Sequence, residues 1–318
     1  MTMRYQAEPD PSEAALERIA RWAPLNPFYT AAYAAARRAR GEQPWLLVLE
    51  DGADGAIAAA CTAFFKGPRL VVPSVPSMPE ESDFWPSLSG TCREISATRL
   101  LLNSYASEPG TIPTLGQSFT LRARREFHLE LGGDGVLRGL SSNHKRNRKR
   151  AEKAGVAIAP IDTREACQVH ARLISASMQR RADRGEAVDT EIGAHNFEHF
   201  VAAGAGRLFQ ASLEGQVFSS ILVLGAARGA YYHSAGTTPE GMKCGASHLL
   251  ICEVAQRLAT EGITRFNLGG AGEEEVGLTR FKTGFGPQPV DLVAAEARFP
   301  GGLKERILVG LKGLRSSS

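Results

Sequence analysis

Two stretches of the chain, about 160 residues apart, follow the same order of apolar runs and turns. Residues 45–73 read WLLVLEDGADGAIAAACTAFFKGPRLVVP, and residues 207–236 read RLFQASLEGQVFSSILVLGAARGAYYHSAG. In each stretch, three apolar runs of strand length are separated by turns that contain Gly, which predicts an antiparallel meander. The similar order and spacing indicate an internal duplication, although any antiparallel meander would give a related pattern.

Helical and strand patterns alternate around both meanders. Apolar residues with a helical period predict helices near 11–23, 28–40, 163–184 and 246–262, and short apolar runs predict strands near 97–108, 118–131, 156–161 and 263–270. A chain of 318 residues is long enough for two domains of ordinary size. The sequence therefore predicts an α/β fold with mixed sheets, arranged as two units.

Positive charge is concentrated in one stretch of this nearly neutral chain. The formal net charge is +3, yet residues 122–153 contain ten Lys or Arg and four Asp or Glu. Within this stretch, Ser141 or Ser142 would begin a helix that Gly155 would end. This helix has no large apolar side chain, so it is expected at a surface or a domain junction. Its charge either faces solvent or contacts the phosphates of a nucleotide, a coenzyme or an RNA.

Several classes of protein are not expected from the composition. The five cysteines are scattered and form no C-x-x-C pair, which argues against a disulfide framework or a zinc site and favours a reduced, cytoplasmic setting. His195 and His199 have metal-ligand spacing, but no third ligand is evident, so no metal is expected. Neither a signal peptide nor an apolar run of membrane-spanning length is visible.

Three segments together resemble a known family. These segments are LSSNHKRNRKRAEKAGVAI (140–158), YYHSAGTTPEGMKCGASHLLICEVAQRLATEGITRFNLGG (231–270) and GLTRFKTGFG (277–286). They are similar to the Fem-type branch of the GNAT acyltransferases, which are tandem-GNAT proteins. The best-known members are aminoacyl-tRNA-dependent ligases that add amino acids to the peptidoglycan stem peptide. The resemblance implies two tandem GNAT-like acyltransferase domains and the transfer of an activated acyl group to an amine.

The resemblance also implies roles for individual residues. Lys282 matches the lysine of the family's Phe–Lys motif and is expected to stabilise charge at the reacting ester, with Phe281 beside it as a pocket wall. Arg280 would bind phosphate or pair with an acidic residue of 273–275. One of Tyr231 and Tyr232 is expected to face the core, and the other to contact the acyl group or act as an acid. The site residues expected from the sequence are Lys282 and Tyr232 as catalytic groups, and Phe281, Arg280, Arg180, Arg181, Tyr231, Lys243, Gly245, Lys145, Arg146 and Lys149 as substrate-binding groups.

The segment MKCGASHLL lies where GNAT enzymes carry a coenzyme A loop, in which amides at a helix N-terminus grip the pyrophosphate. Gly245 matches the first glycine of that loop. Met242 stands where Arg or Gln is expected, and Ser247 stands where the second Gly or Ala is expected. This departure favours an aminoacyl-tRNA donor over coenzyme A, although Lys243 and the free amides could still hold a phosphate.

We therefore expect an N-acyltransferase without a cofactor, in which aminoacyl-tRNA or acyl-CoA is a co-substrate. The favoured reaction moves an aminoacyl group from charged tRNA to the amine of a peptide or small molecule. The alternatives are an acyl-CoA-dependent N-acetyltransferase of surface-polysaccharide or secondary-metabolite synthesis and a non-catalytic tRNA-binding protein. The expected ranges are an N-terminal GNAT-like domain (1–136), a basic junction helix (137–155) and a C-terminal GNAT-like domain (156–318). A basic amphipathic helix is expected near 301–318.

Overall fold

The computed structural model describes residues 3–53, 55–78, 83–115, 119–132, 137–186, 188, 190, 192–272 and 274–300. The amphipathic helix expected near 301–318 lies outside the described residues. The described chain forms two compact units. Unit 1 contains residues 3–19, 41–124 and 291–300, apart from the gaps just given, and unit 2 contains residues 20–40 and 125–290 in the same sense.

Unit 1 is built on strands in the order β1-β2-β3-β4-β5-β12. Neighbouring strands are antiparallel except β4 and β5, which are parallel. Alternate residues of β5 are buried, as expected for a sheet with one face in the core. Its elements are β1 (Met3–Pro9), α1 (Glu13–Trp22), which continues into unit 2, β2 (Gln43–Asp51), β3 (Ile57–Lys66), β4 (Arg69–Val72), α3 (Phe84–Glu94), β5 (Arg99–Leu102) and most of β12 (Gln288–Arg298).

Unit 2 has a matching strand order, β7-β8-β9-β10-β11-β6. Here the parallel neighbours are β10 and β11, and the pairs β7–β8, β8–β9, β9–β10 and β11–β6 are antiparallel. Its elements are η1 (Pro27–Tyr29), α2 (Ala31–Ala39), the second half of β6 (Phe119–Glu130), α4 (Ser142–Lys153), β7 (Ala157–Pro160), α5 (Arg164–Ala182), α6 (His195–Ala202), β8 (Gly206–Leu213), β9 (Gln216–Gly225), β10 (Gly229–Thr237), α7 (Pro239–Cys244), α8 (Ala246–Thr260), β11 (Arg265–Gly270) and α9 (Val276–Thr283).

The two units exchange their last strands. β6 follows β5 in the sequence, yet its second half pairs with β11 in unit 2. β12 follows β11, yet it pairs with β5 in unit 1 through Ala295–Leu102 and the three following pairs. β12 lies within the range 156–318 expected for the C-terminal domain, yet its hydrogen-bond partner is a strand of unit 1. The contiguous ranges 1–136, 137–155 and 156–318 remain a prediction.

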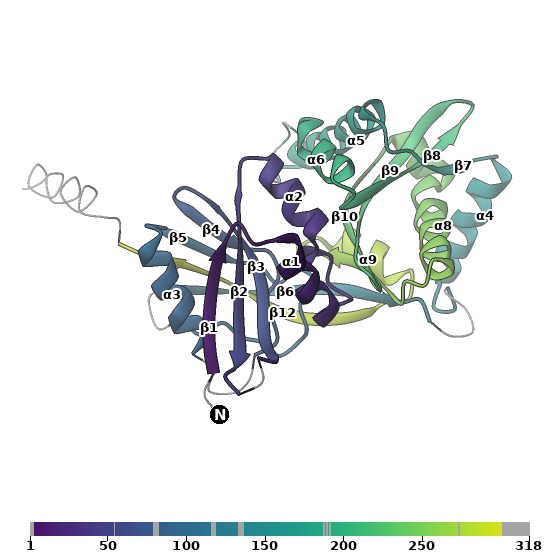
Figure 1. The fold of residues 1–318 in the computed structure, drawn as a ribbon. Coiled ribbons are helices and arrows are strands. Elements are labelled where there is room, and N and C mark those ends of the chain that lie inside the picture. Colours follow the sequence, from purple (N-terminus) through teal and green to yellow (C-terminus); the bar gives the residue numbers. More distant parts are fainter. Residues whose placement is uncertain are drawn as a thin grey trace, which may run out of the picture. The chain divides into compact units, whose positions relative to one another are not determined.

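Helices cover both faces of the unit 2 sheet (Figure 1). α8 packs on β8, β9 and β10, while α5 and α6 pack on the opposite face. The core under α8 combines apolar side chains of five strands, β6 and β8 to β11, with Leu249, Leu250 and Val254 of the helix. The mixed α/β fold predicted from the sequence is confirmed. None of the helices in the described ranges is long and apolar enough to cross a membrane.

The basic helix α4 lies beside α8 and α7 in unit 2 (Figure 1). The Ser141 hydroxyl caps its first turn by accepting from the His144 amide at 3.2 Å, and Gly155, at φ +80°, follows its end. The predicted helix bounds are therefore confirmed. Only His144 and Ala151 of α4 are buried. The Lys and Arg side chains of the helix therefore stay at the surface.

Candidate active site

The parallel strands β10 and β11 separate partway along their length. They pair at Gly229–Arg265, Ala230–Phe266 and Tyr231–Asn267, whereas β10 itself continues to Thr237. A register shift between Tyr232 and Ser234 interrupts its pairing with β9 at the same level. Such irregularities re-aim side chains and are common next to active sites. The separation leaves space between the two strands beyond Tyr231.

A pocket of about 410 Å³ lies beside this separation, under the first turns of α8. Its volume is within the usual range for a small-molecule site. β9, β10, α5, α7, α8 and α9 all contribute side chains, so the pocket is built by unit 2 alone. The lining residues include Arg180, Tyr232, Met242, Ser247, His248 and Phe281.

Lys282 lies at the separation but does not line this pocket. Its side chain is buried, and Nζ donates to the Gly270 carbonyl at 2.6 Å. The same nitrogen lies 5.5 Å from the centroid of the Tyr232 ring, and that ring does line the pocket. A Cβ added to Gly269 would lie 3.5 Å from Nζ and 3.6 Å from the Tyr231 hydroxyl. Lys282 therefore places a cation between the separated strands.

A buried polar network that the sequence did not suggest lies next to Lys282. Glu126 is fully buried and accepts from the Tyr231 hydroxyl at 2.9 Å and from the Asn267 amide at 2.7 Å. The side-chain oxygen of Asn267 accepts from the Gly269 amide at 2.8 Å. Because the adjacent Gly270 carbonyl holds Lys282, these bonds connect Glu126 to the position of the lysine.

The two tyrosines, both expected at the site, take different positions. Tyr231 is buried against Phe28, with ring centroids 5.0 Å apart. Tyr232 is the pocket tyrosine, and burial raises the pKa of its hydroxyl. The phenol is therefore un-ionised at neutral pH and can donate a hydrogen bond or a proton.

His248 lines the pocket. The sequence alone did not decide whether this histidine lies in the core or at a pocket. Burial, together with the charges of His144 and Arg150, lowers the pKa of its ring to about 4. Its Nδ1 is buried and has no hydrogen-bond partner in the described part of the chain. The His144 ring packs edge-on against the His248 ring. The Nε2 atom of His144 lies 2.8 Å from the Phe281 carbonyl oxygen. A neutral imidazole thus faces the pocket with proton-accepting capacity.

Three of the arginines predicted as binding residues differ in whether their guanidinium groups are already engaged by protein partners. Arg180 lines the pocket and donates to the Thr237 carbonyl at 2.8 Å and the Ser177 hydroxyl at 2.9 Å. Arg181 forms ion pairs with Glu186 at 2.6 Å and Glu275 at 2.7 Å. Arg280 is exposed on α9, and Glu275 pairs with Arg181 instead of with it.

The first three residues of the expected coenzyme loop, 242–244, belong to the short helix α7 (Pro239–Cys244). Gly245 then adopts φ +84° and begins α8. Its amide donates to the Gly241 carbonyl at 3.0 Å, and a Cβ at this position would lie 2.4 Å from the Asn147 backbone oxygen. Gly245 therefore permits close packing of α4 on the α7–α8 turn, where L residues are also disfavoured by the left-handed backbone.

The cationic surface expected from the sequence borders this turn. The Arg150 guanidinium donates to the Lys243 carbonyl at 2.9 Å and so joins α4 to α7. Lys145, Arg146 and Lys149 are exposed, and no ion pair to them is found in the described ranges. These three residues and Lys243 are called the α4 basic surface below.

No group of three or more His, Cys, Asp or Glu that could hold a metal ion occurs among the described residues. His195 and His199 both lie on α6. The candidate site therefore consists of the pocket, Lys282 with the Glu126 network, and the α4 basic surface.

Comparison with known proteins identifies the fold. Residues 138–283 match the family described as acetyltransferase (GNAT) domain. The structure of FemX superposes with a TM-score of 0.68 at 13% identity, covering 93% of this chain and 97% of FemX. The C-terminal domain of a putative lysylphosphatidylglycerol synthetase from Agrobacterium fabrum gives a TM-score of 0.58 at 14% identity, covering 90% and 92%.

A tandem GNAT protein from the clavulanic acid biosynthesis pathway gives a TM-score of 0.52 at 14% identity, covering 94% of this chain and all of that one (100%). No curated protein matches the sequence significantly. The resemblance to Fem-type tandem-GNAT proteins and the fold of two GNAT-like domains are thus confirmed.

Proposed function

We propose that this chain, in which residues 138–283 match the acetyltransferase (GNAT) domain family, is an acyltransferase whose donor is an aminoacyl-tRNA. The acceptor in this proposal is the amine of a peptide or small molecule, and the reaction takes place in the cytoplasm. No metal or organic cofactor takes part, since the activated ester already carries the energy for transfer.

The observation that carries the donor assignment is the α4 basic surface at the rim of the pocket. Met242, which lines the pocket, precedes Lys243 on α7, and Arg150 holds α4 against that residue. Lys145, Arg146 and Lys149 continue the positive surface away from the pocket along exposed helix. A polyanion longer than a coenzyme, such as the acceptor stem of a tRNA, would meet this surface while its 3′ end enters the pocket.

The α7–α8 turn further supports this donor. A coenzyme A loop needs free backbone amides where the pyrophosphate binds. Here the Gly245 amide is already bonded to Gly241, and α4 packs against its Cα through Asn147. One amide of the expected loop is therefore used for structure.

The proposed chemistry assigns three roles. The amine nitrogen attacks the ester carbonyl carbon, and Lys282 stabilises the negative charge that develops on the carbonyl oxygen. The carbon–oxygen bond to the ribose then breaks, and Tyr232 supplies the proton that the ribose oxygen takes. His248, neutral at pH 7, accepts the proton that the amine nitrogen loses. Phe281 and Arg180 wall the pocket in which the aminoacyl group is held.

An acyl-CoA donor is the second candidate, and one observation favours it. The pocket lies directly under the start of α8, where the first-turn amides have no acceptor within the helix. The clavulanic acid pathway relative is described as a structure without AcCoA, which connects a protein of this fold with that ligand. In this alternative, the α4 basic surface would contact the phosphates of the coenzyme.

The test compares the two donors. The purified chain is mixed with a pool of charged tRNAs, or with acetyl-CoA, at two salt concentrations, and binding and loss of the acyl bond are followed. We expect salt-sensitive binding of charged tRNA and amine-dependent loss of its ester. The double variant Lys145→Gln/Lys149→Gln should reduce the slope of log affinity against log salt by about one to two units.

The control is Arg172→Gln, an exposed cation of α5, which should leave the slope unchanged. If the chain binds and turns over acetyl-CoA saturably and does not bind charged tRNA, the donor is acyl-CoA and the aminoacyl-tRNA proposal is wrong. If the chain binds tRNA but transfers no acyl group, the catalytic part of the proposal is wrong. The alternative of a non-catalytic tRNA-binding protein would then hold.

A further inference from the structure

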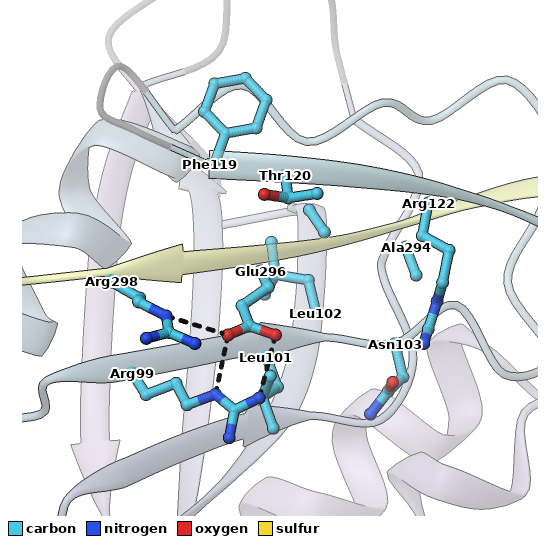
Figure 2. A pocket seen from close by; sticks show the side chains of 11 residues that line it. Arg99, Leu101, Leu102, Asn103, Phe119, Thr120, Arg122, Ala294, Glu296 and Arg298 are labelled. Atoms are coloured by element: carbon cyan, nitrogen blue, oxygen red, sulfur yellow. Dashed lines mark hydrogen bonds and ion pairs between the residues drawn. The ribbon is translucent and has the colours of Figure 1, made fainter. Parts of the chain in front are cut away.

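A second and larger pocket, of about 850 Å³, lies in unit 1 on the sheet face formed by β5, β12 and the first part of β6 (Figure 2). Side chains of all three strands line it, while Leu100 and Ala297 are buried in the core. Because its floor is a hydrogen-bonded sheet, the pocket is preformed. The residues that matter below are Arg99, Leu101, Asn103, Arg122, Glu296 and Arg298.

The pocket carries a net positive charge. Three guanidinium groups and one carboxylate line it, which gives a formal charge of +2. Both oxygens of Glu296 are occupied by Arg99, at 2.8 and 3.0 Å, and Arg298 approaches one of them at 3.5 Å. The hydrogen bond from Arg99 is the main reason that the pKa of Glu296 lies below its usual range. The carboxylate is thus committed to these two arginines.

Arg122 is placed differently from the other two arginines. It extends from β6 on the opposite side of the pocket from Glu296, and its guanidinium end is directed toward Asn103 (Figure 2). No ion pair to Arg122 is found within the described residues, and it is exposed. An available guanidinium fork beside an available amide is a donor arrangement suited to an oxyanion.

We propose that this pocket binds a small molecule bearing a phosphate monoester. Arg122 and Asn103 hold the phosphate oxygens, and Leu101 and Ala294 contact the apolar part of the ligand. A phosphate monoester carries close to two negative charges at neutral pH, which matches the net charge of the lining, whereas a monocarboxylate carries one. Every lining residue belongs to unit 1, so the pocket shares no lining residue with the candidate active site of unit 2.

The test uses naphthyl phosphate as the probe with the full chain and no acyl donor, so its outcome does not depend on the proposed function. Calorimetry gives the affinity, and methyl resonances of labelled leucines locate the site. We expect saturable shifts at Leu101, which lines the pocket. Naphthol and naphthoate serve as the neutral and monoanionic controls and should bind at least about tenfold more weakly, as expected for loss of a charge-assisted bond.

Two variants should act in opposite directions. Arg122→Gln should weaken naphthyl phosphate binding by about 10- to 100-fold. Glu296→Gln should tighten it by about 3- to 10-fold, because it removes the only carboxylate of the lining and frees Arg99 and Arg298. Arg93→Gln, which changes an exposed arginine of α3 away from the pocket, should leave the affinity within about twofold.

Thermal unfolding of each variant establishes that it is folded, which is expected since Arg122 and Arg93 are exposed. The proposal is overturned if the probe causes no saturable shift at Leu101 at millimolar concentration. It is equally overturned if Arg122→Gln binds as the parent does, if Glu296→Gln weakens binding, or if naphthoate binds as tightly as the phosphate.

Discussion

Unit 1 and unit 2 place a parallel strand pair at the same position of their strand orders, and the two pairs end differently. In unit 1, β4 and β5 pair through Val72–Leu102, and backbone bonds continue from the Asn103 amide to Val72 and from Tyr105 to Pro73, at 2.8 and 3.0 Å. In unit 2, the β10–β11 pairing stops at Tyr231–Asn267. Among the described residues, only unit 2 therefore has a strand separation with a lysine in it, which supports placing the chemistry in that unit.

The polar residues are also divided unequally. All seven histidines of the chain belong to unit 2, together with the fully buried Glu126. Unit 1 keeps its charges on an accessible sheet face, where Arg99 and Glu296 pair near solvent. A duplicated fold can thus retain its topology while one copy holds buried titratable groups and the other holds a surface for ligands.

The largest effect should come from the lysine at the strand separation. Lys282→Met is expected to lower kcat about 10²- to 10³-fold, the usual loss when one group that stabilises an oxyanion is removed. The measurement is single-turnover acyl transfer with saturating donor. Arg69→Met, an exposed cation on the matching strand β4 of unit 1, should leave the rate unchanged. Equal losses in both variants, or none in either, would remove the functional distinction between the units.

Acid should destabilise unit 2 more than unit 1. Burial lowers the pKa of His170 to about 3, and those of His233 and His248 to about 4, whereas an unfolded histidine titrates near 6.5. The unfolded chain therefore binds more protons below pH 6.5, so the stability is complete above that pH and falls as the pH drops toward 4. Each histidine contributes up to about 1.4 kcal/mol per pH unit.

Hydrogen exchange by mass spectrometry at pH 7 and pH 5 separates the units in this experiment. Peptides from α5, β9 and β10, which surround His170, should lose protection at pH 5. Peptides from β2 and β3 of unit 1 should lose less, because that unit has no histidine. Equal loss in both units would show that the buried histidines do not govern acid stability.

The two carboxylates Glu126 and Glu296 give a third comparison. Glu126→Gln should lower the free energy of unfolding by about 1–3 kcal/mol, because the donors Tyr231 and Asn267 lose their charged acceptor in a buried site. It should also lower kcat, since the network fixes the carbonyl that holds Lys282. Glu296→Gln should leave the melting temperature almost unchanged, as most solvent-accessible ion pairs contribute little. Urea unfolding measures both, and equal losses would contradict the difference in burial.

The sequence predicted the local features well because their signals are local. Ser141 and Gly155 bound α4 as expected, since a cap and a left-handed glycine act on their own helix. The alternation of a strand explains why Tyr231 lies in the core while Tyr232 lines the pocket, although the sequence left open which of the two would do so. These features need only a few neighbouring residues.

The features that the sequence did not predict depend on distant partners. β1 is a polar segment that becomes a strand because β2 offers it backbone groups. The exchange of β6 and β12 depends on which of two similar sets of strands, β1 to β5 or β7 to β11, each strand pairs with. Glu126 is a charged residue in a strand, and its burial becomes intelligible only with Tyr231 and Asn267, 105 and 141 positions away. No local pattern contains that information.

The smallest effects concern the packing of helices on the two sheets. A Cβ added to Gly236 of β10 would lie 2.4 Å from the backbone of Leu173 in α5. Because the atoms that the new Cβ would meet belong to the backbone of α5, the helix must move away. Gly236→Ala should therefore lower the free energy of unfolding by about 1–3 kcal/mol. Urea unfolding of the variant measures this loss, and a neutral result would show that α5 does not pack as closely as the structure places it.

The matched substitution in unit 1 should have the opposite sign. Gly90 lies inside α3 and a Cβ there would meet nothing within 4 Å. Alanine is favoured over glycine in a helix interior because it restricts the unfolded chain, so Gly90→Ala should raise the free energy of unfolding by about 0.4–1 kcal/mol. The same urea titration detects the gain. If Gly90→Ala were as harmful as Gly236→Ala, the helix of unit 1 would be as tightly opposed as α5, and the packing difference between the units would be lost.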